Sequence, residues 1–354
     1  WSYYWVPFGR HHARLHEPFL HAGKVITVQY PRRVLKPVHT TKAGAKLLGR
    51  DRKYWTHLQA FDMRNGKRHW IAETGTSIHQ TSLPGRTAGG ITAILTGRGG
   101  GHQPPEEPYG LSLVDASDGT TIWDLVIDGY PSAQNACWDG RHAYAFAKKE
   151  HLTIDIESGK IIRRTSLVED VTITRRKDGG YVRTEHSRLE KFKRSLTKNS
   201  NVIAGHYHYF RASETFMIGR INLRSGEVEY LEVPVQVVRR PGEKDETLWS
   251  AALKNDMKNA DGFVASQDQR NAGNGWAHVS AASATVIGDK IYLPTMIGMV
   301  YVLRWDTERL DEKALLSISD LGPATETWSL ASLSYADGRI FARTLKELIC
   351  LGVE

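Results

Sequence analysis

Histidine, tyrosine and arginine side chains recur at one position relative to a repeated glycine turn of this chain. The position lies ten residues before the turn glycine, and its occupants are His79 before Gly89, Tyr130 before Gly140, His278 before Gly288 and Trp328 before Gly338, with His12 and Arg14 flanking the position before Gly23. Imidazole and phenol groups can accept and return protons, and guanidinium groups bind carboxylates. The spacing therefore predicts one set of side chains for chemistry on an acidic substrate, provided that the fold brings them together.

The chemistry that suits this set is β-elimination on a polysaccharide that contains uronic acids. A cation or a neutral histidine would hold the uronate carboxylate and lower the barrier to removing the adjacent C–H proton, and a tyrosine or histidine would be the base. We expect Tyr130, His79 and His12 to form the catalytic set, with Tyr130 or His79 as the base. The expected substrate-binding residues are Arg14, His278, Arg98, Arg211 and Trp328, the last as a stacking platform for a sugar ring.

Two other interpretations of the same residues stay open. His12, His79 and His278 can form a three-histidine site for a divalent metal such as zinc, manganese or iron. Their spacing, however, is not diagnostic of such a site. Each histidine or tryptophan can also cap a sheet by bonding to neighbouring backbone. No cofactor is predicted, and a divalent metal is left as an alternative.

A repeated phrase of sequence is the element that must position these residues. In the copy at Leu111–Trp123 (LSLVDASDGTTIW), alternating residues predict a strand, Asp118-Gly119 a tight turn, and Thr120–Trp123 the returning strand. The phrase recurs with variation at Leu58–Trp70, Leu152–Arg163 and Ile218–Tyr230. A hairpin with its own glycine turn precedes each copy. Two hairpins in succession predict a four-stranded antiparallel blade.

The phrase resembles the outer hairpin of the PQQ-like (quinoprotein-type) β-propeller repeat. This resemblance implies an all-β propeller in which the entrances of the blades converge on one axial face. The chain is more weakly similar to the polysaccharide lyases that are propellers, such as ulvan and oligogalacturonate lyases, in architecture and residue types. PQQ is disfavoured as a cofactor, because quinone dehydrogenases of this family carry a vicinal cysteine pair, whereas Cys137 and Cys350 are far apart.

We expect one propeller domain over residues 1–354. Six blades are clear, and Glu169–Arg194 is either a seventh, degenerate blade or an inserted hairpin, so that seven blades are favoured. The last blade has three strands, and the β-forming segment Trp1–Phe8 would supply the fourth and close the ring. Insertions interrupt the repeat at about 31–53, which is basic, and at about 235–275, where Thr247–Met257 favours a short helix.

The composition indicates an anionic partner. The formal net charge is +8 and the pI about 9.3, which fits an anionic polysaccharide, whereas no motif supports specific nucleic-acid recognition. No apolar run approaches the ~20 residues of a membrane span. An opening on Trp1 without a methionine is typical of a mature chain, so we expect a secreted or periplasmic protein. The alternative function is a non-catalytic PQQ-like propeller scaffold for protein–protein assembly.

Overall fold

The computed structural model describes residues 18–29, 56–76, 82–98, 110–127, 136–190, 201–212, 216–264 and 282–352. Over these residues the regular structure is β-strand, apart from a 3-10 turn, η7, at Glu312–Ala314. The expected all-β class is therefore confirmed. The chain divides into two compact units, Trp1–Thr165 and Ser166–Glu354, which are here called the N-terminal and the C-terminal unit and are described separately.

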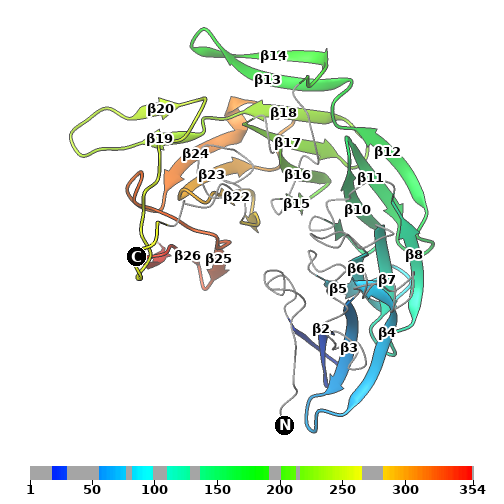
Figure 1. Cartoon of the computed structure of the whole chain (residues 1–354). Helices are drawn as coiled ribbons and strands as arrows, with labels where there is room; N and C mark the ends of the chain where they lie inside the picture. Colours follow the sequence, from blue (N-terminus) through cyan, green and yellow to red (C-terminus); the bar gives the residue numbers. More distant parts are fainter. Residues whose placement is uncertain are drawn as a thin grey trace, which may run out of the picture. The chain divides into compact units, whose positions relative to one another are not determined.

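The N-terminal unit consists of three four-stranded antiparallel sheets, each with its strands in sequence order (Figure 1). The first contains β1 (Phe19–His21), β2 (Lys24–Gln29), β3 (Thr56–Asp62) and β4 (Arg68–Thr76). The second contains β5 (Leu83–Arg86), β6 (Thr92–Arg98), β7 (Gly110–Asp115) and β8 (Thr121–Val126). The third contains β9 (Cys137–Trp138), β10 (His142–Ala147), β11 (Glu150–Asp155) and β12 (Ile161–Ser166). Such meanders are blades of the propeller type, as the two-hairpin pattern predicts.

The repeated phrase forms the outer hairpin of each sheet, and its aspartate fixes the turn. Asp115 Oδ1 accepts the backbone N–H of Ser117 at 2.7 Å, and the N–H of Gly119 donates to the Asp115 carbonyl at 2.9 Å. Asp62, Asp155 and Asn222 bond to the turns that follow them in the same way. A short polar side chain at this position therefore stabilises the turn without help from distant residues.

The tryptophan at the end of the phrase joins one sheet to the next. The ring of Trp70 lies against Gly119 of the second sheet, where a Cβ atom would be 2.6 Å from Cε3 of that ring. The ring of Trp123 lies against Gly159 of the third sheet in the same way, and its Nε1–H donates to the Ile156 carbonyl at 2.6 Å. These glycines also have φ angles of 82° and 69°, so both the conformation and the close approach require glycine.

The two ends of these sheets differ in character. Both hairpin turns of each sheet lie at one end, here called the turn end, and the backbone bond from Ala88 N–H to the Gly140 carbonyl aligns the second and third sheets there. The strands β2, β4, β6 and β8 finish at the opposite end, here called the connection end, because neighbouring strands are antiparallel. Every segment that connects two hairpins of this unit therefore departs from the connection end.

The C-terminal unit contains two further sheets of the blade type and one longer sheet. β13 (Val171–Lys177), β14 (Gly180–Ser187), β15 (Asn201–Ala204), β16 (Tyr207–Ala212), β17 (Met217–Asn222) and β18 (Val228–Glu232) form a six-stranded sheet in the order β14-β13-β18-β17-β16-β15. β21 (Thr285–Ile287), β22 (Lys290–Pro294), β23 (Met299–Arg304) and β24 (Leu315–Asp320) form a four-stranded sheet, and β25 (Ser334–Ala336), β26 (Arg339–Arg343) and β27 (Leu348–Leu351) a three-stranded one.

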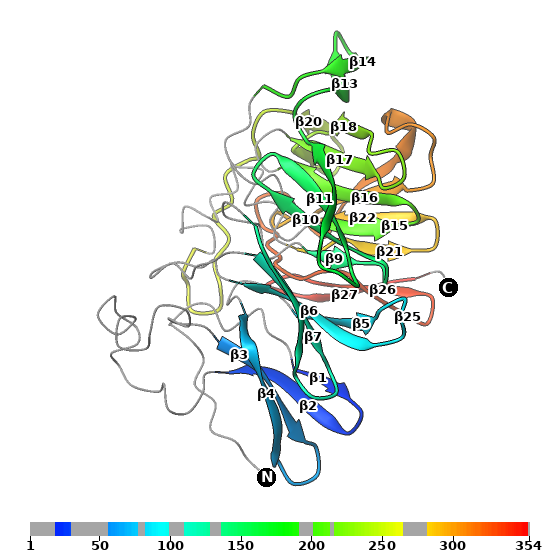
Figure 2. The same ribbon diagram turned by 90° about the vertical axis from the view of Figure 1, so that its right-hand side faces the viewer.

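The stretch Glu169–Arg194 is an inserted hairpin over its described residues. β13 pairs in parallel with β18, and β14 lies outside it, so that the hairpin extends the sheet formed by β15–β18 (Figure 2). A separate seventh four-stranded blade is not found in the described parts of the chain. The segment Trp1–Phe8, which we expect to close the ring, lies outside the described residues.

The insertion that begins at Val235 differs from its prediction. Thr247 belongs to β20 (Glu246–Leu248), which pairs with β19 (Gln236–Val238), and residues 249–257 have no regular structure. The helix predicted for Thr247–Met257 is therefore wrong. Asn255 and Met257 are buried, and the Asn255 side chain donates to the Thr327 carbonyl at 2.8 Å. These distant contacts outweigh the local helix propensity of the segment.

A buried arginine joins the sheets of the C-terminal unit. Arg220 in β17 is 0% exposed, and its Nε bonds to Glu229 Oε2 in β18 at 2.6 Å. Its Nη1 and Nη2 donate to the carbonyls of Thr307 and Glu308, which follow β23, each at 2.7 Å. Glu229 also accepts a bond from Arg183 of the inserted hairpin at 2.8 Å. One carboxylate therefore holds the hairpin and two sheets together.

The two cysteines, Cys137 and Cys350, are not joined in a disulfide. Burial raises the pKa of the Cys137 thiol, whereas Cys350 is exposed on β27. In the described part of the chain, no helix has the length and hydropathy needed to cross a membrane.

Candidate functional site

Most of the predicted site residues lie where the structure gives no description. His12, Arg14, His79, Tyr130 and His278 fall outside the described residues. Arg98 is the last residue of β6, and only its backbone is described. Arg211 and Trp328 are fully described. Whether the predicted catalytic set converges therefore stays a prediction.

The strands that flank two of these residues place the intervening segments at the connection end of the N-terminal unit. β4 finishes at Thr76 and β5 begins at Leu83, on either side of His79 in the sequence. β8 finishes at Val126 and β9 begins at Cys137, on either side of Tyr130. Arg98, the last residue of β6, lies at the same end. Counting back ten residues from the turn glycine therefore leads, for His79 and Tyr130, to segments that leave the sheets at the connection end.

Two exposed lysines lie at this end of the third sheet. Lys148 and Lys149 form the turn between β10 and β11. Glu150, the next residue, forms an ion pair of 2.8 Å with Arg164 of β12. The turn and its ion pair together carry a net positive charge. These side chains are the described part of the basic face that the sequence predicts.

A cluster of hydroxyl groups and one carboxylate lies nearby in the N-terminal unit. Asp124 Oδ1 accepts bonds from Thr74 of β4 at 2.8 Å and from Ser112 of β7 at 2.5 Å. Thr74 and Ser112 are both buried. The cluster ties the first sheet to the second, so its evident role is structural. The alternation of apolar and polar residues within each strand does not predict that Thr74, Ser112 and Asp124 contact one another.

Arg211, a predicted substrate-binding residue, is buried in the C-terminal unit. Its side chain is 1% exposed, and its Nη2 donates to the Pro294 carbonyl of β22 at 2.6 Å. Burial lowers the pKa of Arg211 to about 10, so the group stays charged at neutral pH. In this structure Arg211 contacts backbone of the neighbouring sheet and not solvent.

Trp328, the predicted stacking platform, is part of the hydrophobic core. It is 3% exposed and belongs to a buried cluster with Met257, Met296 and Ile297. Stacking on a sugar requires an exposed ring face. The structure therefore gives Trp328 a packing role.

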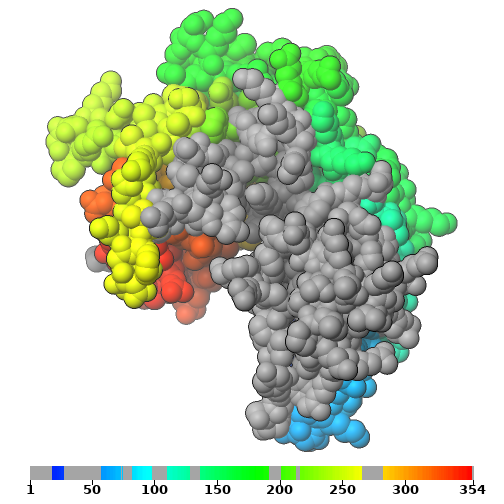
Figure 3. All heavy atoms as spheres, in the orientation of Figure 1, coloured from blue at the N-terminus to red at the C-terminus, as the bar shows by residue number. Residues whose placement is uncertain are grey.

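The insertion after β18 explains why Trp328 is buried. The N–H of Leu253 donates to Gln236 Oε1 at 2.8 Å, and Asn255 bonds to the Thr327 carbonyl just before Trp328. In Figure 3 these yellow-green to yellow residues lie in front of the orange and red residues of the following sheets. Residues 236–257 therefore cover this end of the C-terminal unit and are here called the cap.

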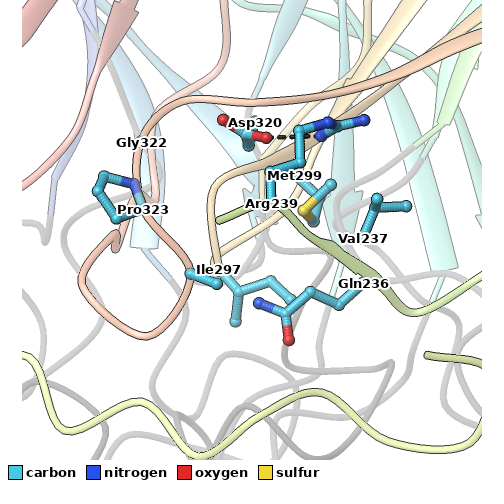
Figure 4. Close-up of a pocket in the computed structure, with 9 residues that line it drawn as sticks. Gln236, Val237, Arg239, Ile297, Met299, Asp320, Gly322 and Pro323 are labelled. Atoms are coloured by element: carbon cyan, nitrogen blue, oxygen red, sulfur yellow. Dashed lines mark hydrogen bonds and ion pairs between the residues drawn. The ribbon is translucent and has the colours of Figure 1, made fainter. Parts of the chain in front are cut away.

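A small pocket lies between the cap and the four-stranded sheet of this unit. Its lining includes Gln236, Ile297 and Met299, and at its edge Arg239 bonds to Asp320 at 2.6 Å (Figure 4). Arg239 also donates to the Ile318 carbonyl at 2.7 Å. The volume is 20 Å³, whereas drug-sized ligands occupy about 300–1,000 Å³. The pocket therefore has room for water and not for a sugar.

The distribution of charge separates the two units. Residues 1–165 contain 22 Lys and Arg against 14 Asp and Glu, a net charge of +8, whereas residues 166–354 contain 25 of each. Within the first range, residues 31–53 alone contribute eight Lys and Arg against one Asp. The excess charge that predicts an anionic partner therefore belongs to the N-terminal unit.

The described residues contain no group of three or more His, Cys, Asp or Glu side chains that could hold a metal ion. The three histidines of the alternative metal site, His12, His79 and His278, lie outside this range, so that alternative stays untested.

Comparisons with known proteins give no family. No family model matches the chain, and no curated protein matches it. Among solved structures, BamB from Moraxella catarrhalis is similar over 93% of this chain and 81% of that protein, at 13% identity and a TM-score of 0.37. The computationally designed Ika8 protein is similar over 97% of both chains, at 10% identity and a TM-score of 0.35. Values this low carry no argument about function, and the propeller-type description rests on the sheets themselves.

Proposed function

We propose that this chain is a PQQ-like β-propeller that binds an anionic, uronic-acid-containing polysaccharide at the connection end of its N-terminal unit. The observation that carries the proposal is the partition of charge, with +8 in residues 1–165 and zero in residues 166–354. A surface of one sign attracts a polyanion and raises its rate of association. The exposed Lys148 and Lys149 bring part of this charge to the connection end.

We further propose that the bound polysaccharide is cleaved by β-elimination. Tyr130 or His79 would take the proton from the carbon next to the uronate carboxylate, while His12 and Arg14 neutralise the charge that develops on that carboxylate. The C–O bond at the β-carbon would then break as a C=C bond forms, and a nearby acid would protonate the departing sugar oxygen. The segments that carry His79 and Tyr130 both leave the sheets at the same end, and this supports the assignment. In the C-terminal unit, Arg211 and Trp328 are buried, and the proposed site does not include them.

Three parts of the account stay predictions: closure of the ring by Trp1–Phe8, the number of blades, and a secreted or periplasmic location. The expected count of seven loses its candidate for the seventh blade, because β13 and β14 extend the sheet of β15–β18. Closure is supported by the sheet β25–β27, which has three strands where the blade pattern has four. Its edge strand β27 exposes Leu348 and Leu351. An apolar edge strand favours pairing with a further strand.

The test is incubation of the full chain with polygalacturonate, alginate and ulvan, with and without a metal chelator. Binding should weaken as salt rises, and cleavage should produce the ultraviolet absorbance of an unsaturated uronate. Tyr130→Phe should abolish cleavage and retain binding, and the exposed Tyr335→Phe is the matched control. Absence of both binding and cleavage on all three polymers would refute the proposal. Binding without cleavage would refute the lyase step alone.

A second candidate function, a scaffold for protein assembly, is favoured by the last sheet. Leu330, Leu345 and Leu348 lie in or close to that sheet in the sequence and are 56%, 50% and 74% exposed. Exposed apolar side chains mark an interface when they form a contiguous patch. A scaffold would bind none of the three polymers. Its complex with a partner identified by cross-linking in cells would weaken on Leu345→Ser and Leu348→Ser.

A further inference from the structure

One kind of tryptophan–glycine contact occurs twice in the N-terminal unit. The Trp70 ring lies on Gly119 of the second sheet, and the Trp123 ring lies on Gly159 of the third. A Cβ atom on either glycine would come within 2.7 Å of the ring, and both glycines are buried. The glycine of the repeated phrase is therefore a docking position for a tryptophan that belongs to the preceding sheet.

Gly66 of the first sheet has the backbone of such a docking position. Its φ angle is 72°, and its N–H donates to the Asp62 carbonyl at 2.9 Å, as in the other copies of the phrase. Met63, which follows the aspartate, is 48% exposed, whereas the equivalent Ala116 and Ile156 are 0% exposed. Among the described strands of this unit β1 is the first, so a tryptophan for Gly66 would come from the segment that precedes β1.

The spacing of the sequence identifies Trp5 as this tryptophan. β5 begins 13 residues after Trp70, and β9 begins 14 residues after Trp123. β1 begins 14 residues after Trp5, whereas it begins 18 residues after Trp1. Trp5 therefore stands in the same relation to the first sheet as Trp70 to the second and Trp123 to the third.

The candidate catalytic residues keep the same distance from these tryptophans. His79 and Tyr130 follow theirs by nine and seven residues. His12 and Arg14 follow Trp5 by seven and nine residues. In the first two cases a strand, β4 or β8, carries the chain from the docked tryptophan to the connection end. A strand that passes through a docked Trp5 would bring the segment with His12 and Arg14 to that end as well.

We propose that Trp5 docks on Gly66 of the same chain. A docked Trp5 would position the segment with His12 and Arg14 at the connection end. Trp5 lies outside the described residues. Its ring would cover the Met63 side chain, and methionine sulfur makes favourable contacts with aromatic rings. The positioning of His12 and Arg14 rests on the proposed function and deepens it, whereas the docking of Trp5 is independent of any polysaccharide.

The docking is tested by thermal unfolding of full-length variants. Gly66→Ala should lower the melting temperature as much as Gly119→Ala, because both new Cβ atoms would strike a ring. Gly23→Ala is the matched control, since its φ is 74° and no atom lies within 4 Å of the new Cβ. The effect of Gly23→Ala should be roughly a third as large. In a Trp5→Ala background, the effect of Gly66→Ala should fall to that of Gly23→Ala, and in a Trp1→Ala background it should not change.

A second measurement of the docking needs no change at Gly66. Hydrogen peroxide oxidises exposed methionine to its sulfoxide, and a docked Trp5 would shield Met63. Oxidation of Met63, followed by peptide mass spectrometry, should be severalfold faster in Trp5→Ala than in the parent. In Trp1→Ala it should proceed at the rate of the parent.

Positioning has a separate readout, the cleavage of polygalacturonate. Trp5→Ala should lower kcat roughly tenfold or more with little change in KM, because the segment with His12 and Arg14 would lose its position relative to the bound polymer. Trp5→Phe, which keeps an aromatic ring, should restore most of the activity.

The outcomes separate the docking from the positioning. An equal cost of Gly66→Ala in the parent and in the Trp5→Ala background, or coupling of Gly66 to Trp1 instead, would overturn the docking of Trp5. A dimer in size-exclusion chromatography that dissociates on Trp5→Ala would assign the docked ring to a second copy, and would overturn docking within one chain. Coupling of Trp5 to Gly66 with unchanged cleavage by Trp5→Ala would overturn the positioning alone. A parent chain that cleaves no polymer would overturn the lyase step and the positioning, and leave the docking standing.

Discussion

The two units of this chain share one kind of contact between neighbouring sheets and differ in a second. In the N-terminal unit, the rings of Trp70 and Trp123 lie on Gly119 and Gly159 of the next sheet. In the C-terminal unit, the ring of Trp305, which follows β23, lies on Gly205 of the neighbouring sheet. The buried Arg220 of β17 adds bonds to Glu229 and two carbonyls. The tryptophan–glycine contact, here called the apolar joint, depends mainly on shape, with one added bond from Trp123 Nε1–H to the Ile156 carbonyl. The network around Arg220, here called the charged joint, requires all of its hydrogen-bond partners, because an unpaired buried charge lowers the free energy of unfolding by a large amount.

The connection ends differ as well. In the C-terminal unit the cap covers Trp328, and Arg211 is buried against the backbone of β22. In the N-terminal unit Lys148 and Lys149 stay exposed. The cap therefore covers a blade entrance of the C-terminal unit at Trp328, whereas these two lysines of the N-terminal unit are surface residues. We infer that ligand binding belongs to the N-terminal unit.

The largest expected effect comes from removing the charged joint. Arg220→Ala should lower the free energy of unfolding by about 3–5 kcal/mol, because it leaves Glu229 without its buried partner. The measurement is denaturant unfolding, and the exposed Arg224→Ala is the control, with an effect below about 0.5 kcal/mol. A loss of less than about 1 kcal/mol for Arg220→Ala would show that this joint contributes little.

The apolar joint is tested by two glycines with similar φ angles. Gly119→Ala should cost about 3 kcal/mol, because the new Cβ would strike the Trp70 ring in addition to straining the backbone. Gly23→Ala should cost about 1 kcal/mol, because its φ is 74° and no atom lies within 4 Å of the new Cβ. Equal costs for the two variants would mean that the Trp70 contact does not hold the sheets together.

Acid should destabilise the C-terminal unit through His208. This residue is buried beside Asn201, and burial lowers its pKa to about 3. The unfolded chain binds a proton below pH ~6.5, whereas the folded chain does not until about pH 3. Stability is therefore full above pH 6.5 and is lost as pH falls from there toward 3. Between pH 6.5 and 5 the loss should be about 1–2 kcal/mol.

The control for this prediction is His208→Gln, which cannot take up a proton. Denaturant unfolding at pH 6.5 and pH 5 should show a smaller loss for the variant than for the parent. The same loss in both proteins would contradict a buried, neutral His208.

The smallest effect concerns the cap. Asn255→Ala removes the bond to the Thr327 carbonyl and should cost about 1–2 kcal/mol, since a buried carbonyl loses its donor. It should also make the Trp328 fluorescence easier to quench with acrylamide. The exposed neighbour Lys254→Ala is the control for both measurements. Unchanged quenching would mean that the cap is held without Asn255.

The sequence predicts the local parts of this fold well. Asp115, Gly119 and Trp123 lie within one phrase, and the turn and strands that they form depend on contacts inside that phrase or with the next copy of it. Because the phrase recurs along the chain, its pattern can be recognised from the sequence alone. The four-stranded sheets and the inner hairpins follow from the same phrase.

Contacts between distant segments could not be predicted. Arg211 and Trp328 were expected on an open face. Trp328 is instead covered by the cap, and Arg211 bonds to the backbone of β22, so the burial of each depends on a segment distant in sequence. Arg220 was missed, because a single arginine in a strand usually faces solvent. One signal was present: Arg220 and Glu229 are register partners on neighbouring strands, and the hairpin phrase alone gives that pairing.

The central claim, that an acidic polysaccharide binds the N-terminal unit, is tested most directly by carbodiimide cross-linking of polygalacturonate to the full chain, followed by peptide mass spectrometry. The reagent joins polymer carboxylates to lysine amines that touch them. We predict adducts at Lys148, Lys149 and the lysines of residues 31–53, and none above background at the exposed Lys177, Lys244, Lys254 and Lys313 of the C-terminal unit. Adducts spread equally over both sets, or confined to the second, would contradict the account.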